Sequence, residues 1–117
     1  MEEDAIRVLF LRLERDRAFY KKAFEITGQN SFEEILEQYL YQMFMECLLK
    51  YPLKTQPGIK IWKEEVIAKY YSISLASVIK GWITEDKMEM SADEVTKGYY
   101  LLLTHSIFDL IDKKEHL

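Results

Sequence analysis

An unbroken repeat of apolar residues, three or four positions apart, runs from Phe32 to Tyr51 and constrains the fold more than any other feature. Apolar residues with this spacing lie on one face of an α-helix. The segment in front of it forms a capping box, in which Ser31 accepts from the amide of Glu34 and Glu34 reaches back. Pro52 follows the repeat and disfavours helical geometry in the residue before it. The sequence therefore predicts a long helix over this whole segment.

Similar patterns predict the remaining helices. Asp16 is a possible cap for a short helix whose apolar face is Phe19, Tyr20 and Phe24, and Gly28 follows where a helix end favours a left-handed residue. A second capping box, Ser91-Ala-Asp-Glu94, precedes the final apolar repeat. The expected helices, besides the one above, span about Glu3 to Glu14, a segment after Asp16, about Lys60 to Ile83, and about Ala92 to Asp112.

The stretch 70–83, "YYSISLASVIKGWI", raises a competing possibility, because Tyr71 to Leu75 alternate as a β-strand would. The helical spacing extends over more than twenty residues from Ile61 to Ile83, whereas the alternation is local. A strand of average length has about five or six residues. The helical period is therefore the better prediction for the whole stretch.

Composition supports a chain of few long elements. Only four Gly and two Pro occur among 117 residues, which is too few turn formers for a β-sandwich or barrel. The length and the 49% hydrophobic content predict one domain with a real core. We therefore expect an all-α fold, an antiparallel helical bundle that forms a single regulatory domain over residues 1–117.

Charge and cysteine content exclude several classes of protein. The formal net charge is −4 and no basic stripe occurs, so direct DNA binding by this chain is not expected. The single cysteine, Cys47, supports no disulfide framework and no zinc site, and it fits a cytoplasmic protein. The acidic start carries no signal-peptide pattern, and no apolar run approaches the ~20 residues of a membrane span.

The last two expected helices are apolar on two sides, whereas a surface helix of a small monomer shows one apolar stripe. A second copy of the chain would cover the extra side, because C2 dimers are the commonest oligomers. Small residues there would let the helix backbones approach closely. Packing inside one subunit is the alternative. The expected dimer seam of four helices comprises Ser74, Ser77, Val78, Gly81, Trp82, Tyr99, Leu102, Leu103, Ser106 and Leu110.

Two segments, "RDRAFYKKAFEITGQNSFEEILEQYLYQMF" and "YYSISLASVIKGWITEDKMEMSADEV", resemble the C-terminal regulatory domain of TetR-type transcriptional regulators. The similarity is greatest to the branch of dihydroxyacetone kinase operon regulators. The resemblance spans about Ile6 to Asp112. It implies an all-helical fold, a dimer made by the last two helices, and a cavity in the earlier helices for a small effector.

The family's DNA-binding helix-turn-helix precedes the first helix expected here. The sequence begins too late to contain it, so DNA would be bound only through a domain outside this chain. Three readings stay open: an excised effector domain, the product of a truncated gene, or a stand-alone relative. No cofactor is expected.

Aromatic and Met side chains in the middle of the chain are candidates for an effector pocket, with ordinary core packing as the alternative. They are Tyr39, Met43, Phe44, Trp62, Tyr70 and Tyr71. The effector would be small and apolar or aromatic, and a protein co-regulator is the other possible partner of this homodimer.

Catalytic and metal-binding patterns are weak. His105 and Asp109 are four positions apart, which favours an ion pair on the last helix over a metal or acid–base site. His116 lies in a charged tail that we expect to be disordered. Cys47 lies on an apolar stripe, where an inert buried thiol is the ordinary expectation. An enzyme is therefore not expected. The sequence favours an effector-sensing and dimerisation domain, with a helical homodimeric adaptor lacking a ligand cavity as the alternative.

Overall fold

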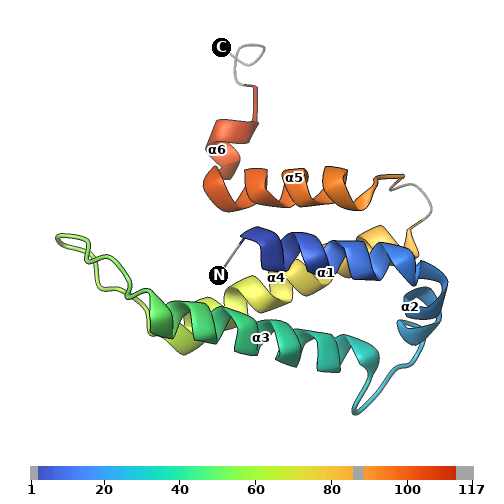
Figure 1. The fold of residues 1–117 in the computed structure, drawn as a ribbon. Helices are drawn as coiled ribbons and strands as arrows, with labels where there is room; N and C mark the ends of the chain where they lie inside the picture. The colour runs from blue at the N-terminus through green and yellow to red at the C-terminus, as the bar shows by residue number, and fades with distance from the viewer. Residues whose placement is uncertain (1–2, 86–88, 113–117) are drawn as a thin grey trace.

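The computed structural model describes residues 3–85 and 89–112, and every regular element in this part of the chain is a helix (Figure 1). The expectation for His116 lies outside these residues. The all-α fold is confirmed. The helices are α1 (Glu3–Arg15), α2 (Arg17–Ala23), α3 (Phe32–Lys50), α4 (Glu64–Thr84), α5 (Ala92–Thr104) and α6 (Ile107–Leu110).

Serine side chains cap the two helices whose starts were predicted from capping boxes. The Ser31 hydroxyl accepts from the amide of Glu34 at 3.2 Å, but the Glu34 carboxylate accepts from the amide of Asn30 instead of that of Ser31. The box at α5 is complete, with Ser91 and Glu94 each accepting from the other's amide. Local capping chemistry thus determines where α3 and α5 begin.

Three predicted helix boundaries are wrong. The helix expected from Lys60 begins at Glu64, and α2 ends at Ala23, so Gly28 is in the following turn although its φ of 92° is left-handed as expected. The last helix stops at Thr104 instead of continuing to residue 112.

Ser106 explains why the last helix stops. Its amide and its hydroxyl both donate to the Asp109 carboxylate, at 3.0 and 3.1 Å. Such an N-cap needs extended backbone, and Ser106 has φ −82° and ψ 164°. A new short helix, α6, therefore starts there. His105 and Asp109 consequently do not share a helix, and the predicted ion pair on one helix face is wrong.

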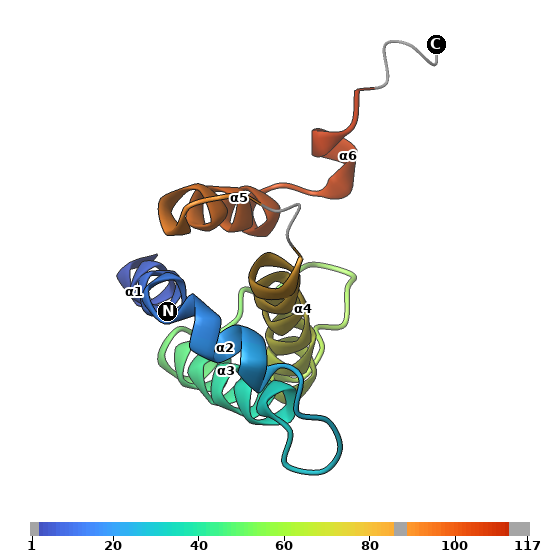
Figure 2. The same cartoon turned by 90° about the vertical axis from the view of Figure 1, so that its right-hand side faces the viewer.

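The helices form layers (Figures 1 and 2). α3 and α4 pack as an antiparallel pair, α2 contacts the end of α4, and α5 lies against α1. α1 and α4 occupy the middle, with α3 on one side and α5 on the other. The loop between α3 and α4 projects from one end of the pair, and α6 points away from the body.

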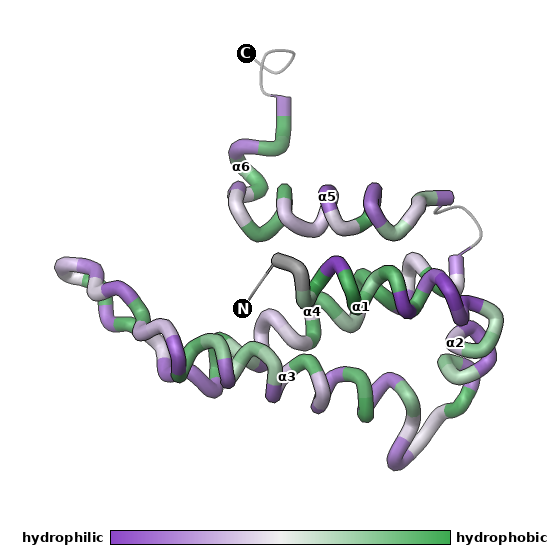
Figure 3. Tube along the Cα trace, viewed as in Figure 1, coloured by the Kyte–Doolittle hydropathy of each residue, from purple (hydrophilic) through white to green (hydrophobic). Residues whose placement is uncertain are grey.

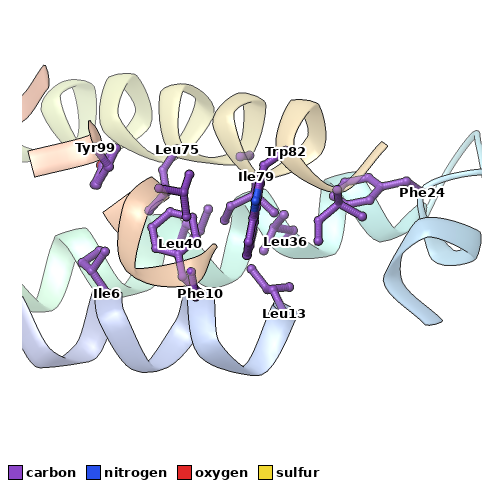
Figure 4. Packing of buried hydrophobic residues seen from close by; sticks show 14 of the residues in the cluster. Ile6, Phe10, Leu13, Phe24, Leu36, Leu40, Leu75, Ile79, Trp82 and Tyr99 are labelled. Atoms are coloured by element: carbon purple, nitrogen blue, oxygen red, sulfur yellow. The ribbon is translucent and has the colours of Figure 1, made fainter. Parts of the chain in front are cut away.

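Aromatic rings from three helices meet in the core (Figure 4). The Phe10 ring of α1 contacts the Trp82 ring of α4 edge-on, at 5.5 Å between centroids, and lies 6.3 Å from the Tyr99 ring of α5. The Trp82 indole N–H donates to the carbonyl of Met90 at 2.8 Å. Leu36 and Leu40 add the contribution of α3. One core therefore joins α1, α3, α4 and α5.

The molecule exposes more surface than a compact monomer of its size. Its accessible area is 9044 Å², against about 6,700 Å² expected for a folded chain of 14.0 kDa. Its radius of gyration is 16.2 Å, against about 13 Å. In Figure 3, hydrophobic positions recur along α3 and α4, and several of their apolar side chains lie outside the core. The fold leaves apolar faces uncovered.

Candidate effector and dimerisation surfaces

A broad groove runs along the outer side of the α3–α4 pair, with a volume of about 970 Å³. Three aromatic residues in it are largely exposed: Tyr39 at 59%, Trp62 at 66% and Tyr70 at 62%. Both helices contribute because each places large side chains one turn apart on the same side. These are Ile35 and Tyr39 on α3, and Tyr70 and Ile73 on α4. The complete lining is Ile35, Glu37, Gln38, Tyr39, Tyr41, Gln42, Trp62, Glu65, Val66, Lys69, Tyr70 and Ile73.

A smaller, apolar pocket of about 180 Å³ lies where α3, α4 and α5 come together. The Phe44 and Tyr71 rings line it in a tilted arrangement, with 5.5 Å between their centroids and 30° between their planes. Cys47 is half-buried beside them, as a lining residue. The six lining residues are Phe44, Cys47, Leu48, Ile67, Tyr71 and Leu103.

Five of the six candidate effector residues are therefore divided between two places. Tyr39, Trp62 and Tyr70 line the outer groove, whereas Phe44 and Tyr71 line the small pocket. Met43 lines neither and packs, partly buried, against the core. Tyr70 and Tyr71 separate because consecutive residues on a helix point about 100° apart.

Sequence reasoning missed the aliphatic and amide members of the outer groove. Ile35, Gln38 and Gln42 lie on one outward side of α3, and Val66 and Ile73 flank Tyr70 on α4. These residues recur three or four positions apart on both helices, and this spacing could have identified them from the sequence.

A third groove, of about 400 Å³, lies between α4 and α5. Five of the ten predicted seam residues line it: Ser77, Val78, Gly81, Tyr99 and Leu102. Gly98 of α5, which was not predicted, adds another small residue. Apart from the backbone of α5 itself and the two chain neighbours, nothing lies within 4 Å of the position that a Cβ atom would take at Gly98, so a side chain would have open space there.

The other predicted seam residues lie elsewhere. Ser74 is on the next turn of α4, where its hydroxyl donates to the carbonyl of Tyr70 at 2.8 Å. Leu103 lines the small pocket, Ser106 caps α6, and Leu110 ends it.

The prediction of Trp82 as a seam residue is wrong. Its side chain is 0% exposed and lies inside the subunit, held by Phe10 and by its hydrogen bond to Met90. Tyr99 is only 4% exposed, and its ring also points toward the core. The sequence pattern identified apolar rows correctly but could not tell which row faces the subunit's own α1.

The Tyr99 hydroxyl has an unusual environment. It is buried and has no hydrogen-bond partner within the described part of the chain. Burial, and to a lesser degree the nearby charges of ionised Tyr71 and Tyr100, raise the pKa of Tyr99 well above its ordinary value. This phenol therefore ionises only in more alkaline solution than an exposed tyrosine does.

Charged residues do not assemble a metal site in the described ranges, where His, Cys, Asp and Glu form no cluster of three or more that could hold an ion. The His105 ring lies near its own helix end, with Nδ1 3.2 Å from the carbonyl of Leu101. Over residues 3–85 and 89–112, no helix has both the length and the apolar character needed to cross a bilayer.

Comparison with known proteins gives one match. A family model of the TetR type, described as "Transcriptional regulator C-terminal region", matches residues 2–105, a range that contains α1 to α5 and ends before α6. No curated protein and no solved structure matches the chain. The matched family is one of regulators and agrees with the all-α architecture. Because the match covers most of the sequence, the chain belongs to the family of TetR-type transcriptional regulator C-terminal regions.

Proposed function

We propose that this chain is the effector-sensing and dimerisation domain of a TetR-type regulator, of the branch resembling regulators of dihydroxyacetone kinase operons. It couples the binding of a small molecule or protein co-regulator to operator binding by an N-terminal helix-turn-helix outside residues 1–117. The observation that carries this proposal is the family match over α1 to α5.

Dimerisation is supported by the uncovered surface. The excess over a compact monomer is about 2,300 Å², and obligate dimer interfaces bury about 2,000–5,000 Å² in total over both partners. The groove between α4 and α5 carries Ser77, Gly81 and Gly98, which leave room for a helix of a second copy. We place the seam there.

Sensing is supported by the outer groove. Trp and Tyr are the residues that most often dominate the binding energy of a protein interface, and here three of them stand exposed on one face. The groove is open, so it suits side chains of a protein co-regulator or a large flat effector. Such a partner acts only by binding one quaternary arrangement better than another.

The route from these surfaces to DNA runs through α1. The amide of Ala92 donates to the Glu14 carboxylate at 2.6 Å, and Arg7 pairs with Asp93 at 3.2 Å, so α1 is tied to the first turn of α5. The helix-turn-helix of this family precedes the segment that corresponds to α1. Movement of α5 at the seam would therefore change the position of α1.

Sedimentation of the purified protein tests the seam. We expect a dimer for the wild type and a weakened dimer for Gly81→Leu and Gly98→Leu, with helical circular dichroism retained. Lys97→Leu adds the same side chain one position away on α5 and should stay dimeric. If both glycine variants remain dimers, the seam is not between α4 and α5. A monomeric wild type would overturn the dimerisation function itself.

The alternative is a helical homodimeric adaptor, favoured by the openness of the outer groove. Operator binding by the regulator separates the two. Tyr39→Ala and Trp62→Ala should abolish the response to the co-regulator or effector while the dimer persists. An adaptor would show no operator response in any variant, and the reading frame upstream of the gene would encode no helix-turn-helix.

A further inference from the structure

The last helix, α6, is largely uncovered by the rest of the subunit. Figures 1 and 2 show it projecting from the end of α5, away from the other helices, and none of its residues is buried. Its side chains are nevertheless mostly apolar: Ile107 is 67% exposed, and Ile111, directly after the helix, is 50% exposed. A helix of one turn is not stable by itself in water. This segment, residues 106–112, which we call the C-terminal arm, therefore needs a surface to pack on.

Local hydrogen bonds fix the direction of the C-terminal arm. The amide and the hydroxyl of Ser106 both donate to the Asp109 carboxylate, and the Ser106 carbonyl accepts from the amide of Asp109 at 3.0 Å. His105 and Ser106 both have extended backbone, with ψ 148° and 164°, so the chain leaves the axis of α5 there. These bonds set the orientation of the arm, and packing against another surface has to supply the remaining stability.

The C-terminal arm lies on the side of the molecule where the dimer seam is proposed. In Figure 2, α6 is displaced from the end of α5 toward the side of α4, away from α1. The groove between α4 and α5 is lined in part by Leu102, which is 55% exposed and precedes Ile107 by five positions. The apolar side chains of the arm therefore extend the surface that a second copy would cover.

The groove by itself is small for a stable interface. Nine residues line it, whereas a stable protein–protein interface has roughly 20–30 residues on each partner. The chain also exposes about 2,300 Å² more than a compact monomer of its mass, and Ile107, Leu110 and Ile111 are among its exposed apolar residues. A second copy seated on the groove would need further contacts, and the arm is the adjoining apolar segment.

The charge of the arm narrows the choice of occupant. Asp109 and Asp112 are the only charged residues between positions 106 and 112. Nucleic acid and an anionic lipid surface would be repelled by these carboxylates. A second copy offers an apolar surface instead, because Leu101 and Leu102 of its α5 are each about half exposed.

We propose that each subunit of the dimer packs its C-terminal arm on the other, so that the two arms complete the seam at the α4–α5 groove. This inference rests on the proposed dimerisation function and adds the segment that the partner subunit holds. Ile107, Leu110 and Ile111 supply the apolar contact, and a two-fold axis makes that contact reciprocal. The family model ends at residue 105, before the arm, so the contact would be an addition to the shared domain.

Hydrogen exchange of the unmodified protein tests where the arm packs. The amides of Asp109 and Ile111 donate to carbonyls within the arm, in a turn that would open rapidly without further support. Mass spectrometry of a peptide covering residues 105–112 should show amide exchange at least tenfold slower above the dissociation constant of the dimer than below it. Equal rates at both concentrations would overturn the inference, because the arm would then be either uncovered or packed on its own subunit.

Substitutions in the arm test the same contact through the affinity of the dimer. Ile107→Ser and Ile111→Ser should each raise the dissociation constant, measured by sedimentation, by at least about tenfold, because each removes an apolar contact twice. Ile26→Ser is the matched control: Ile26 is 60% exposed in the segment between α2 and α3, and its replacement should leave the constant unchanged. Circular dichroism checks that each variant is folded.

The results distinguish this inference from the proposed function. A wild-type dimer whose dissociation constant is unchanged in both arm variants would overturn the packing of the arms and leave dimerisation intact. An equally large loss of affinity in Ile26→Ser would also overturn it, because the effect would not be specific to the arm. A monomeric wild type would instead overturn the proposed function, and the inference with it.

Discussion

The guanidinium of Arg17 in α2 donates a 2.8 Å hydrogen bond to the backbone carbonyl of Trp82 in α4, and it lies 5.9 Å from the centre of the Trp82 ring. The last turn of α4 contains no basic residue of its own. Arg17 therefore supplies, from another helix, the positive charge that a helix C-terminus favours.

Replacing Arg17 by Met should lower the free energy of unfolding by about 1.5–3 kcal/mol, the usual range for a hydrogen bond to a charged group. Urea denaturation measures it. Arg15→Met is the control, because Arg15 pairs with its neighbour Asp16 through exposed side chains and should change little. Equal midpoints for both variants would mean that the Arg17 contact adds nothing to stability.

The two tryptophans should report opposite environments. Trp82 is 0% exposed and Trp62 is 66% exposed. In Trp62→Phe, we expect blue-shifted emission that acrylamide quenches poorly, because only the buried indole remains. In Trp82→Phe, the emission should be red-shifted and easily quenched. Similar quenching in the two variants would contradict either the buried core or the open groove.

Tyr99 should make the protein sensitive to alkali. Its pKa is raised in the folded state above the ordinary value of 10.0, so its stabilising effect is complete below pH 10 and is lost as pH rises further. The unfolding free energy of the wild type should therefore fall above pH 10. In Tyr99→Phe this fall should be smaller. Urea titrations at a series of alkaline pH values give both curves, and parallel curves would show that Tyr99 ionises normally.

Glu94 should make the stability of the fold depend on pH in the acid range. Hydrogen bonds from the Ser91 amide and then the Ser91 hydroxyl lower the pKa of Glu94 below its ordinary value of 4.5. The cap therefore stabilises the fold fully above that pH and less as pH falls through the lowered pKa. Glu94→Gln should show a flatter loss of stability on acidification. Glu89→Gln, on an exposed residue outside the cap, should follow the wild type.

Helix starts were predictable because their chemistry is local. Ser31 and Ser91 satisfy amides three residues away, which the sequence displays directly. The same chemistry at Ser106 ended the last helix, and it was missed because the apolar repeat continues through Ile107 and Ile111. The apolar repeat alone does not show where a side-chain cap will end one helix and begin another.

Candidate site residues were harder to predict than helices. Tyr70 and Tyr71 are neighbours in sequence, yet one lines the outer groove and the other the small pocket. Trp82 belongs to an apolar row that could have faced a partner, but α1 covers it through Phe10. Such assignments depend on which helix packs on which side, and that information is not contained in any one segment.

The hydrogen bond from Ala92 to Glu14 fastens the end of α1 to the beginning of α5, across 78 positions of sequence. One end of α1 is therefore tied directly to the first turn of α5, in addition to the apolar core that both helices share. If the domain works as proposed above, a displacement of α5 would reach α1 through this short link without passing through the outer aromatic groove, none of whose lining residues belongs to α1 or α5.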